Sequence, residues 1–327
     1  MATGSDLRAR PLGRSGLETP PLAMGGNAFG WTADERASYA VLDAFVDAGF
    51  SLVDTADVYS KWVPGNVGGE SEAIIGRWFK ASGKRSKVLL ATKLGGETAP
   101  GRKGLSAKHV RSAVEDSLRR LQTDYIDLYQ AHYPDDDVAF EETLAAFADL
   151  IKQGKVRAIG VSNHSPEQIR ASLAAAAAHR LPRYETLQPL YNLYDRAEFE
   201  QRFAELCITE SVGVISYYAL ASGFLSGKYR NEADVKASKR QRSNMKYLNE
   251  RGFTILGALD EVAARTGAKQ AQIALAWIIA QPAVTAPIAS ATSAQQVEEL
   301  AAAARLKLDA QSLSLLNEAS AYEPALA

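Results

Sequence analysis

Short apolar segments alternate along this chain with longer amphipathic ones. Eight apolar segments are continuous runs of the length expected for strands buried on both faces, and they span residues 22–26, 51–56, 88–94, 126–132, 156–162, 186–191, 213–219 and 285–290. Ahead of them, the turn residues Arg14-Ser-Gly16 predict a hairpin between residues 12 and 24. The pattern therefore predicts a molecule built around parallel strands.

The segments between these runs carry helix signals. Apolar residues recur three or four positions apart, as in segment 106–121, which begins with the N-capping residue Ser106. Helices are predicted at residues 34–48, 70–80, 106–121, 138–153, from 165 onward, and at 198–208, 270–280 and 294–304. Strand and helix alternating eight times predict an α/β fold, the (β/α)8 TIM barrel.

Two segments interrupt this alternation. Segment 221–249 is long, basic and rich in Gly, Ser and Asn, and a loop of this length after the seventh strand is expected to be functional or mobile. Segment 309–320 predicts one extra helix that packs outside the barrel. Since no stretch is rich enough in Pro or Gly to form a linker, we expect residues 1–327 to form a single domain.

Four residues with acid–base chemistry stand at or just after the ends of predicted strands: Asp54, Tyr59, Lys93 and His132. The carboxyl ends of the strands of a barrel meet on one face, so we expect these side chains to converge. A free phenol is a weak acid, and a neighbouring ammonium should lower its pKa. The carboxylate can hold the ammonium in place, and the imidazole can donate a hydrogen bond to a carbonyl oxygen. The set predicts a site that delivers a proton.

Composition excludes several classes of function. The formal net charge of −1 gives no global field for binding nucleic acid or a membrane surface. The single cysteine, Cys207, cannot form an internal disulfide, and neither a signal peptide nor an apolar stretch long enough to span a bilayer is visible, so we expect a cytoplasmic protein. The other histidines show no ligand spacing, and no metal site is predicted.

Several motifs carry a resemblance to a known family. They are Gly49-Phe-Ser-Leu-Val-Asp-Thr-Ala-Asp-Val-Tyr59, Ala91-Thr-Lys93, Leu128-Tyr-Gln-Ala-His132, Gly154-Lys-Val-Arg-Ala-Ile-Gly-Val-Ser-Asn163, Leu187-Gln-Pro-Leu-Tyr-Asn192 and Gly223-Phe-Leu-Ser-Gly-Lys228. In this order they resemble the aldo-keto reductase superfamily, most closely its bacterial branch related to the potassium-channel β subunit, over about residues 8 to 305. The resemblance implies a barrel that binds a nicotinamide dinucleotide without a Rossmann domain, and no G-x-G-x-x-G stands between a strand and a helix.

The resemblance also assigns roles to residues. Asp54, Tyr59, Lys93 and His132 match the catalytic four, with Tyr59 as the proton donor. The residues matched to the nicotinamide carboxamide are Ser162, Asn163 and Gln188, and Tyr217 matches the aromatic residue that stacks on the nicotinamide ring. Those matched to the ribose and pyrophosphate are Tyr218, Leu220, Ser222, Gly223 and Lys228.

The adenine end departs from the family pattern. Ser290, Thr292, Gln296 and Glu299 stand at its positions, but residue 300 is Leu where relatives carry Asn, and no Arg or Lys lies in segment 289–300. A cation from the long segment, such as Lys239, could contact a 2′-phosphate instead. We therefore expect NADP(H) as cofactor, with weak discrimination against NAD(H).

Aromatic residues flank the motifs and suggest a bulky substrate. Trp31, Trp62 and Tyr133 are expected at the mouth, where they suit a ring ketone or its alcohol, although the two tryptophans could equally pack loops together. The expected function is reversible, NAD(P)H-dependent reduction of an aldehyde or ketone (EC 1.1.1 type). Two other readings stay open: a non-catalytic cofactor-binding regulator on the same fold, and a lyase that uses Lys93 as a Schiff-base amine. The oligomeric state is not predicted.

Overall fold

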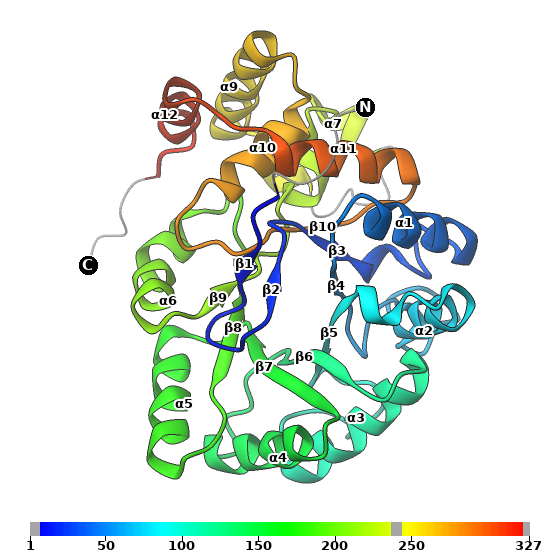
Figure 1. Ribbon diagram of the computed structural model, residues 1–327. Coiled ribbons are helices and arrows are strands. Elements are labelled where there is room, and N and C mark those ends of the chain that lie inside the picture. The colour runs from blue at the N-terminus through cyan, green and yellow to red at the C-terminus, as the bar shows by residue number, and fades with distance from the viewer. Residues whose placement is uncertain (1–6, 237–243, 323–327) are drawn as a thin grey trace.

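Eight short parallel strands form the centre of the molecule (Figure 1). The structure is a computed structural model that describes residues 7–236 and 244–322. The strands are β3 (Ala23–Gly25), β4 (Leu52–Asp54), β5 (Leu89–Leu94), β6 (Ile126–Ala131), β7 (Val156–Ser162), β8 (Tyr184–Gln188), β9 (Gly213–Val214) and β10 (Ile288–Ala289). Their order in the sheet is β10-β3-β4-β5-β6-β7-β8-β9, so neighbours along the chain are neighbours in space.

Hydrogen bonds between the last two strand segments close the sheet. The backbone N–H of Thr285 donates to the carbonyl of Val214 at 2.9 Å, and that of Ile288 donates to Ser216 at 2.8 Å. Since β10 also pairs with β3, the sheet has no free edge. The predicted α/β barrel is confirmed.

Neighbouring residues within a strand face different layers of the core. Leu52 and Leu128 belong to a small apolar cluster inside the barrel, whereas Val53 and Tyr129 belong to the large cluster between strands and helices. Side chains in a strand alternate between the two faces, so a run that is apolar throughout is buried on both. This explains why the strands appear in the sequence as continuous apolar segments.

A short hairpin covers one end of the barrel. Strand β1 (Arg10–Pro11) pairs with β2 (Glu18–Thr19), and the residues between them include Leu12 and Leu17, which join the inner apolar cluster. The strand predicted at residues 22–26 is confirmed as β3, whereas the predicted hairpin bounds of 12 to 24 are wrong, because Met24 pairs with β4 and β10. A hairpin strand and a barrel strand would both bury this apolar run, and closure of the barrel selects the second arrangement.

Helices surround the barrel, as Figure 1 shows. They are α1 (Glu35–Asp47), α2 (Glu70–Ser82), α3 (Ala107–Leu121), α4 (Phe140–Lys152), α5 (Pro166–His179), α6 (Ala204–Glu210), α10 (Gln270–Ile279) and α11 (Ala294–Arg305), with one π-helical turn, η3 (Phe199–Phe203), before α6. The Ser106 side chain accepts a hydrogen bond from the backbone of His109, and Ser165 forms a capping box with Gln168. The predicted helix starts at Ser106 and Ser165 therefore have the expected physical cause.

Two further helices lie side by side outside the barrel (Figure 1). The helix predicted at 309–320 is present as α12 (Ala310–Ala319), whereas α9 (Glu250–Thr266) is not predicted from the sequence. Its apolar residues, including Ile255 and Leu259, are buried, and it packs against both α12 and α10. A helix inserted between the seventh strand and α10 adds to the eightfold repeat, so strand–helix counting does not reveal it.

The long segment after the seventh strand is only partly irregular. It contains η4 (Ala221–Ser226), α7 (Glu232–Lys236) and η5 (Met245–Tyr247). The expectation of one long loop is therefore wrong for these described parts. Separately, none of the described helices has the length and apolar character needed to cross a membrane.

Close packing between α2 and α3 gives a test of the fold. Gly76 is buried in α2, and a Cβ there would lie 2.2 Å from the backbone oxygen of Arg120. Gly76→Ala should therefore lower the free energy of unfolding by about 1–3 kcal/mol, since backbone atoms must move. The control is Gly257→Ala in α9, where an added Cβ would have no atom of another part of the structure within 4 Å. This change should raise the free energy of unfolding by about 0.5–1 kcal/mol. Denaturant unfolding measures both, and equal effects would contradict the packing.

Candidate active site

The four side chains expected to converge do so at the carboxyl ends of β4, β5 and β6. Asp54 ends β4, Lys93 lies near the end of β5, His132 follows β6, and Tyr59 comes from the segment after β4. The ammonium of Lys93 donates to Asp54 Oδ2 at 2.7 Å and to the Tyr59 hydroxyl oxygen at 2.8 Å. The barrel therefore brings together groups separated by almost eighty positions in sequence.

Lys93 is fully buried and uses all its hydrogens. Its third hydrogen bond goes to the backbone oxygen of Thr55 at 2.8 Å, so the three donors of the ammonium are all occupied. Burial lowers the pKa of Lys93, and the Asp54 carboxylate opposes that effect. An ammonium held in this way is a fixed charge and a poor nucleophile, which weighs against the Schiff-base reading.

Tyr59 is a weaker acid than the sequence predicts. Burial is the main cause that raises its pKa well above the ordinary value of 10, and the charge of Asp54 raises it further. The net shift is therefore opposite to the lowering that the sequence predicts, because burial and the charge of Asp54 dominate it. The phenol keeps its proton at neutral pH. Because Lys93 donates to the phenolic oxygen, that proton must point elsewhere, and its only described acceptor, Asp54 Oδ2, is distant at 3.4 Å.

His132 lies beside Tyr59 as a neutral imidazole. Its side chain is buried, with ring centroids 6.1 Å apart between His132 and Tyr59, and it stacks on Tyr133 at 4.5 Å. Burial, with the charge of Lys93, lowers the pKa of His132 to about 3. A neutral imidazole has one N–H, and Nδ1 has no partner within the described part of the chain. The ring can therefore donate one hydrogen bond toward an oxygen placed near Tyr59.

Two glutamines hold the other oxygen of Asp54. The amide of Gln188 donates to Asp54 Oδ1 at 2.8 Å, and that of Gln130 donates to the same atom at 3.3 Å. The resemblance matches Gln188 to the nicotinamide carboxamide, whereas Gln130 is not among the predicted site residues. The available signal is that Gln130 is a polar residue inside a strand buried along its whole length.

The residues matched to the carboxamide surround the same end of the barrel. The Asn163 amide donates to the backbone oxygen of His132 at 2.8 Å and accepts from the Tyr217 hydroxyl at 3.2 Å. The Ser162 hydroxyl donates to the backbone oxygen of Gln188 at 2.8 Å. These contacts connect the residues proposed to bind a nicotinamide with the backbone that carries His132.

The turn after β9 has a strained backbone. Three non-glycine residues, Tyr218, Ala221 and Ser222, have φ values of 55°, 48° and 58°, and Gly223 follows with 94°. A left-handed conformation costs a non-glycine residue roughly 1–2 kcal/mol, and such strain gathers at functional sites. Leu220, in the middle of the turn, keeps a negative φ of −106°.

A lysine lies against this turn. A Cβ at Gly223 would be 3.3 Å from the Nζ atom of Lys228, and no carboxylate lies within 4 Å of that Nζ in the described residues. Backbone N–H groups in a left-handed turn together with an ammonium are the kind of groups that bind phosphate. The turn therefore fits the pyrophosphate-binding role that the resemblance implies.

The predicted adenine-end residues each have a polar partner, and two of them, Thr292 and Gln296, contact each other. The Ser290 hydroxyl and Asn27 Oδ1 are 2.6 Å apart, and the Gln296 side chain accepts from the backbone N–H of Thr292 at 2.8 Å. Glu299 forms an ion pair with Lys269, a cation that the sequence analysis does not consider. Lys239 lies outside the described residues.

An open cavity of about 460 Å³ adjoins Tyr59 and His132. Its lining includes Trp62 and Tyr133, about half exposed, together with Lys61 and Glu97, which the sequence analysis does not assign. Trp31 is absent from the lining and meets Trp62 edge to face at 5.7 Å. Trp62 therefore serves both expected purposes, as a cavity wall and as a loop contact, while Trp31 supports it.

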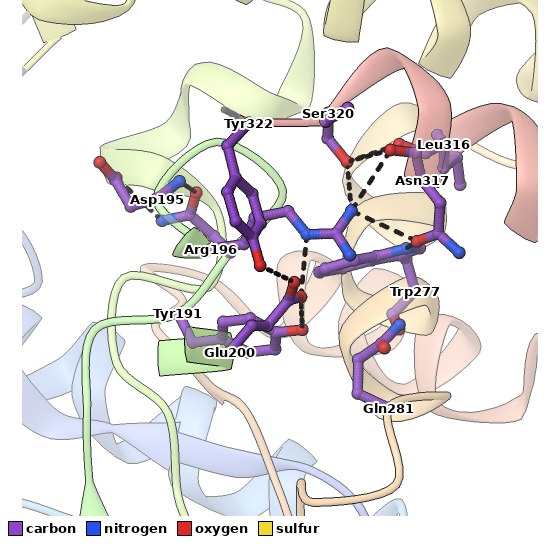
Figure 2. Close-up of polar contacts among 12 residues, drawn as sticks. Tyr191, Asp195, Arg196, Glu200, Trp277, Gln281, Leu316, Asn317, Ser320 and Tyr322 are labelled. Atoms are coloured by element: carbon purple, nitrogen blue, oxygen red, sulfur yellow. Dashed lines mark hydrogen bonds and ion pairs between the residues drawn. The ribbon is translucent and has the colours of Figure 1, made fainter. Parts of the chain in front are cut away.

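A partly buried arginine fixes the loop beside Tyr217. Figure 2 shows Arg196 between that loop and the C-terminal residues: its Nε pairs with Glu200 at 2.8 Å and its Nη1 donates to the Ser320 hydroxyl at 2.7 Å. The guanidinium also lies 4.7 Å from the ring centroid of Trp277, and Tyr322 donates to Glu200 at 3.1 Å. Charge, stacking and hydrogen bonding therefore anchor the chain end to the loop after β8.

The same loop contacts both sides of the segment that follows β9. The amide of Asn192 donates to the backbone oxygen of Tyr218 at 3.1 Å, and Tyr247 donates to Asp195 at 2.7 Å. Asn192 is fully buried, so its hydrogen bond to Tyr218 is shielded from water. The strained turn is thus held at its start, and the segment is held again near its end.

Comparison with known proteins agrees with this arrangement. The model of the Aldo/keto reductase family matches residues 21–321. This chain belongs to the aldo/keto reductase family. It is 37% identical over 293 residues to the aldo-keto reductase YhdN of Bacillus subtilis (strain 168), covering 88% of this chain and 83% of YhdN.

Other members of the family are similar over nearly their whole length. The oxidoreductase YrpG of Bacillus subtilis (strain 168) is 34% identical over 316 residues, with 94% of each chain covered. A probable voltage-gated potassium channel subunit beta of Oryza sativa subsp. japonica is 34% identical over 302 residues, with 90% of each covered. The predicted resemblance is confirmed, and this aldo/keto reductase has relatives named as oxidoreductases and as channel subunits. Among its described residues, no group of three or more His, Cys, Asp or Glu is arranged to hold a metal.

The low pKa of His132 predicts a pH-dependent contribution to stability. In the unfolded chain the imidazole binds a proton below a pH of about 6.5, whereas in the folded reductase its pKa is about 3. The unfolded state therefore binds more protons in this interval, and falling pH lowers the free energy of unfolding. Between pH 7 and 5 the wild type should lose about 2 kcal/mol more than the His132→Gln variant. Equal losses in urea unfolding would mean that the pKa of His132 in the folded state is close to its ordinary value of 6.5.

Proposed function

We propose that this aldo/keto reductase reversibly reduces an aldehyde or ketone to an alcohol with NADP(H). The observation that carries the proposal is the fully buried Lys93, hydrogen-bonded to Tyr59 and Asp54, with the neutral His132 beside them on the wall of an open cavity. A family of oxidoreductases supplies the reaction class. The side chains of Tyr59, Lys93 and His132 supply the groups that donate and stabilise the proton.

A nicotinamide cofactor would supply the hydride. The residues present fit such a group. Asn163 and Gln188 lie near the site, with their amides held by His132 and Asp54. Tyr217 offers a ring face, and the strained turn offers Ser222 and Gly223 beside Lys228. These groups lie together at the carboxyl end of the barrel, next to the cavity wall formed by His132. The fit rests on three features at the carboxyl end of the barrel: an aromatic ring, two amide groups, and a left-handed turn beside a lysine.

Tyr59 donates the proton in this proposal. Hydride arrival at a carbonyl carbon places negative charge on the oxygen, and an acid within hydrogen-bond reach stabilises that charge. The raised pKa keeps the phenol protonated until the stronger base, an alkoxide, is formed. The ammonium of Lys93 then stabilises the phenolate that remains, at the 2.8 Å distance already present. His132 positions the carbonyl oxygen by donating its single N–H.

The cavity favours a substrate with a ring. Trp62 and Tyr133 provide aromatic surface around the reacting position, and Tyr218 is half exposed nearby on the turn after β9. Aromatic walls bind apolar rings through area burial and edge or face contacts, and they exclude water from the reaction. We therefore propose a ring ketone or its alcohol as the substrate class.

A second candidate is a non-catalytic regulator that binds the cofactor. The observation that favours it is the similarity to a protein named as a potassium channel subunit. A turnover assay with nitrobenzaldehyde separates the two functions: oxidation of NADPH above the rate without enzyme supports the reductase. Cofactor binding with no turnover across a panel of aldehydes and ring ketones supports the regulator.

Replacing the proposed proton donor tests the mechanism. Tyr59→Phe should lower kcat for carbonyl reduction by roughly 10²–10⁴-fold, because the acid is lost while the ring remains. NADPH binding, followed by protein fluorescence, should be almost unchanged. Tyr39→Phe is the matched control, since Tyr39 lies on α1 and donates to the surface residue Glu35. A Tyr59→Phe variant that retains more than about a tenth of wild-type kcat would show that another group is the acid.

The adenine end predicts weak cofactor discrimination. Thr292 and Gln296 offer neutral groups to a 2′-phosphate, and the nearby cation Lys269 is already paired with Glu299. Hydrogen bonds to neutral groups are about half as strong as charge-assisted ones. The ratio of kcat/KM for NADPH and NADH should therefore stay below roughly a thousandfold in favour of NADPH, or about 4 kcal/mol. A larger ratio in either direction contradicts this prediction.

A further inference from the structure

A second cavity lies behind the segment that carries Tyr59. Its volume is about 180 Å³, and it shares no lining residue with the cavity beside His132. One wall is a face of α3, including His109 and Ala113, and the other includes Asp57 and the loop residues that precede α2. A water occupies about 30 Å³ in the liquid, so this space is large enough for a small polar molecule.

Asp57 is an unpartnered carboxyl group in the wall of this cavity. Its exposed fraction is 2%, and neither carboxylate oxygen has a hydrogen-bond partner within the described residues. Burial, together with the charge of Glu72, raises the pKa of Asp57 well above its usual range. The charges of Arg120 and Lys93 and the backbone N–H of Val58 offset this only in part. A buried carboxylate without a partner is costly, so a ligand that supplies hydrogen bonds and positive charge would be stabilised there.

His109 presents a second unmatched group to the same cavity. Its exposed fraction is 9%, and Nε2 is buried without a partner in the described chain. Burial lowers the pKa of His109, which favours the neutral ring. In the tautomer with its proton on Nδ1, the Nε2 atom accepts a hydrogen bond. The cavity therefore contains two groups that can accept hydrogen bonds from a ligand.

The other charged residues of this wall are already paired. Arg102 pairs with Asp116 at 2.5 Å, and Arg120 pairs with Glu72 at 2.7 Å. Asp116 also pairs with Arg119 at 2.7 Å. Asp57 is therefore the one carboxylate of the described cavity lining that forms no ion pair. Each of the two guanidiniums already holds a carboxylate, Asp116 or Glu72. The complementary ligand is consequently a cation with N–H donors.

We propose that this cavity binds a small alkylammonium cation, with Asp57 as its counter-ion and His109 as a second acceptor. The site is independent of the proposed reductase function, because it uses none of the residues that touch substrate or cofactor there. It is nevertheless close to them in the chain: the backbone N–H of Asp57 donates to the carbonyl oxygen of Lys93 at 3.1 Å.

Thermal unfolding with methylammonium chloride tests the site directly. A ligand that binds only the folded state raises Tm with saturation, so methylammonium should do so at constant ionic strength. NaCl and KCl supply the charge without N–H donors, and tetramethylammonium is a larger cation without N–H groups, so none of them should raise Tm in this way. An equal shift with KCl would mean a bare-cation site and would overturn the proposal, as would no saturable shift with methylammonium.

Variants show whether the shift comes from this cavity. Asp57→Asn keeps the shape of the side chain and removes its charge, and it should weaken methylammonium binding roughly tenfold or more, the value of a lost charge-assisted hydrogen bond. Ala113→Leu fills the space from α3 and should abolish the shift even if Asp57→Asn does not fold. The surface change Asp124→Asn should retain the wild-type shift. Wild-type binding in both Asp57→Asn and Ala113→Leu would overturn the proposal.

Discussion

The buried ammonium of Lys93 is the constraint on which the site depends. A charge with no exposure to water must be compensated locally, and here Asp54, Thr55 and Tyr59 receive its three hydrogen bonds. Removing any one partner would leave part of that charge unsatisfied. The compensation fixes the ends of β4 and β5 relative to each other, and it holds the phenolic oxygen of Tyr59 at a defined place on the cavity wall.

The surrounding barrel stabilises this buried ion pair. Asp54 carries the opposite charge, and Gln188 with Gln130 bonds its second oxygen, so the carboxylate is satisfied on both sides. Low solvent access also changes the acid–base behaviour of the site. It keeps the phenol of Tyr59 protonated and the imidazole of His132 neutral. A protonated donor and a neutral hydrogen-bond donor next to a fixed cation suit the stabilisation of a developing alkoxide better than a set of freely titrating groups would.

Part of the fold and site could be predicted because the signals are local. The apolar runs, the caps at Ser106 and Ser165, and the residue types at strand ends all follow from neighbouring residues in sequence. The errors concern interactions between distant segments. The pairing partner of Met24 depends on barrel closure, and the burial of Ile255 in α9 depends on the neighbouring helices. The role of Gln130 is not visible in the sequence, because its partner Asp54 lies 76 positions away.

The eightfold alternation, the family and the identity of the four converging residues can be read from the linear chain, because periodicity and motif order are properties of that chain. The electrostatics of these four residues depend on the folded arrangement. The direction of the Tyr59 pKa shift reflects the balance between desolvation and charge, and that balance depends on how completely other segments cover the ring. The same holds for Asp57, whose carboxyl group is ordinary in the sequence and becomes unpartnered through the packing of α3 against the segment that carries it.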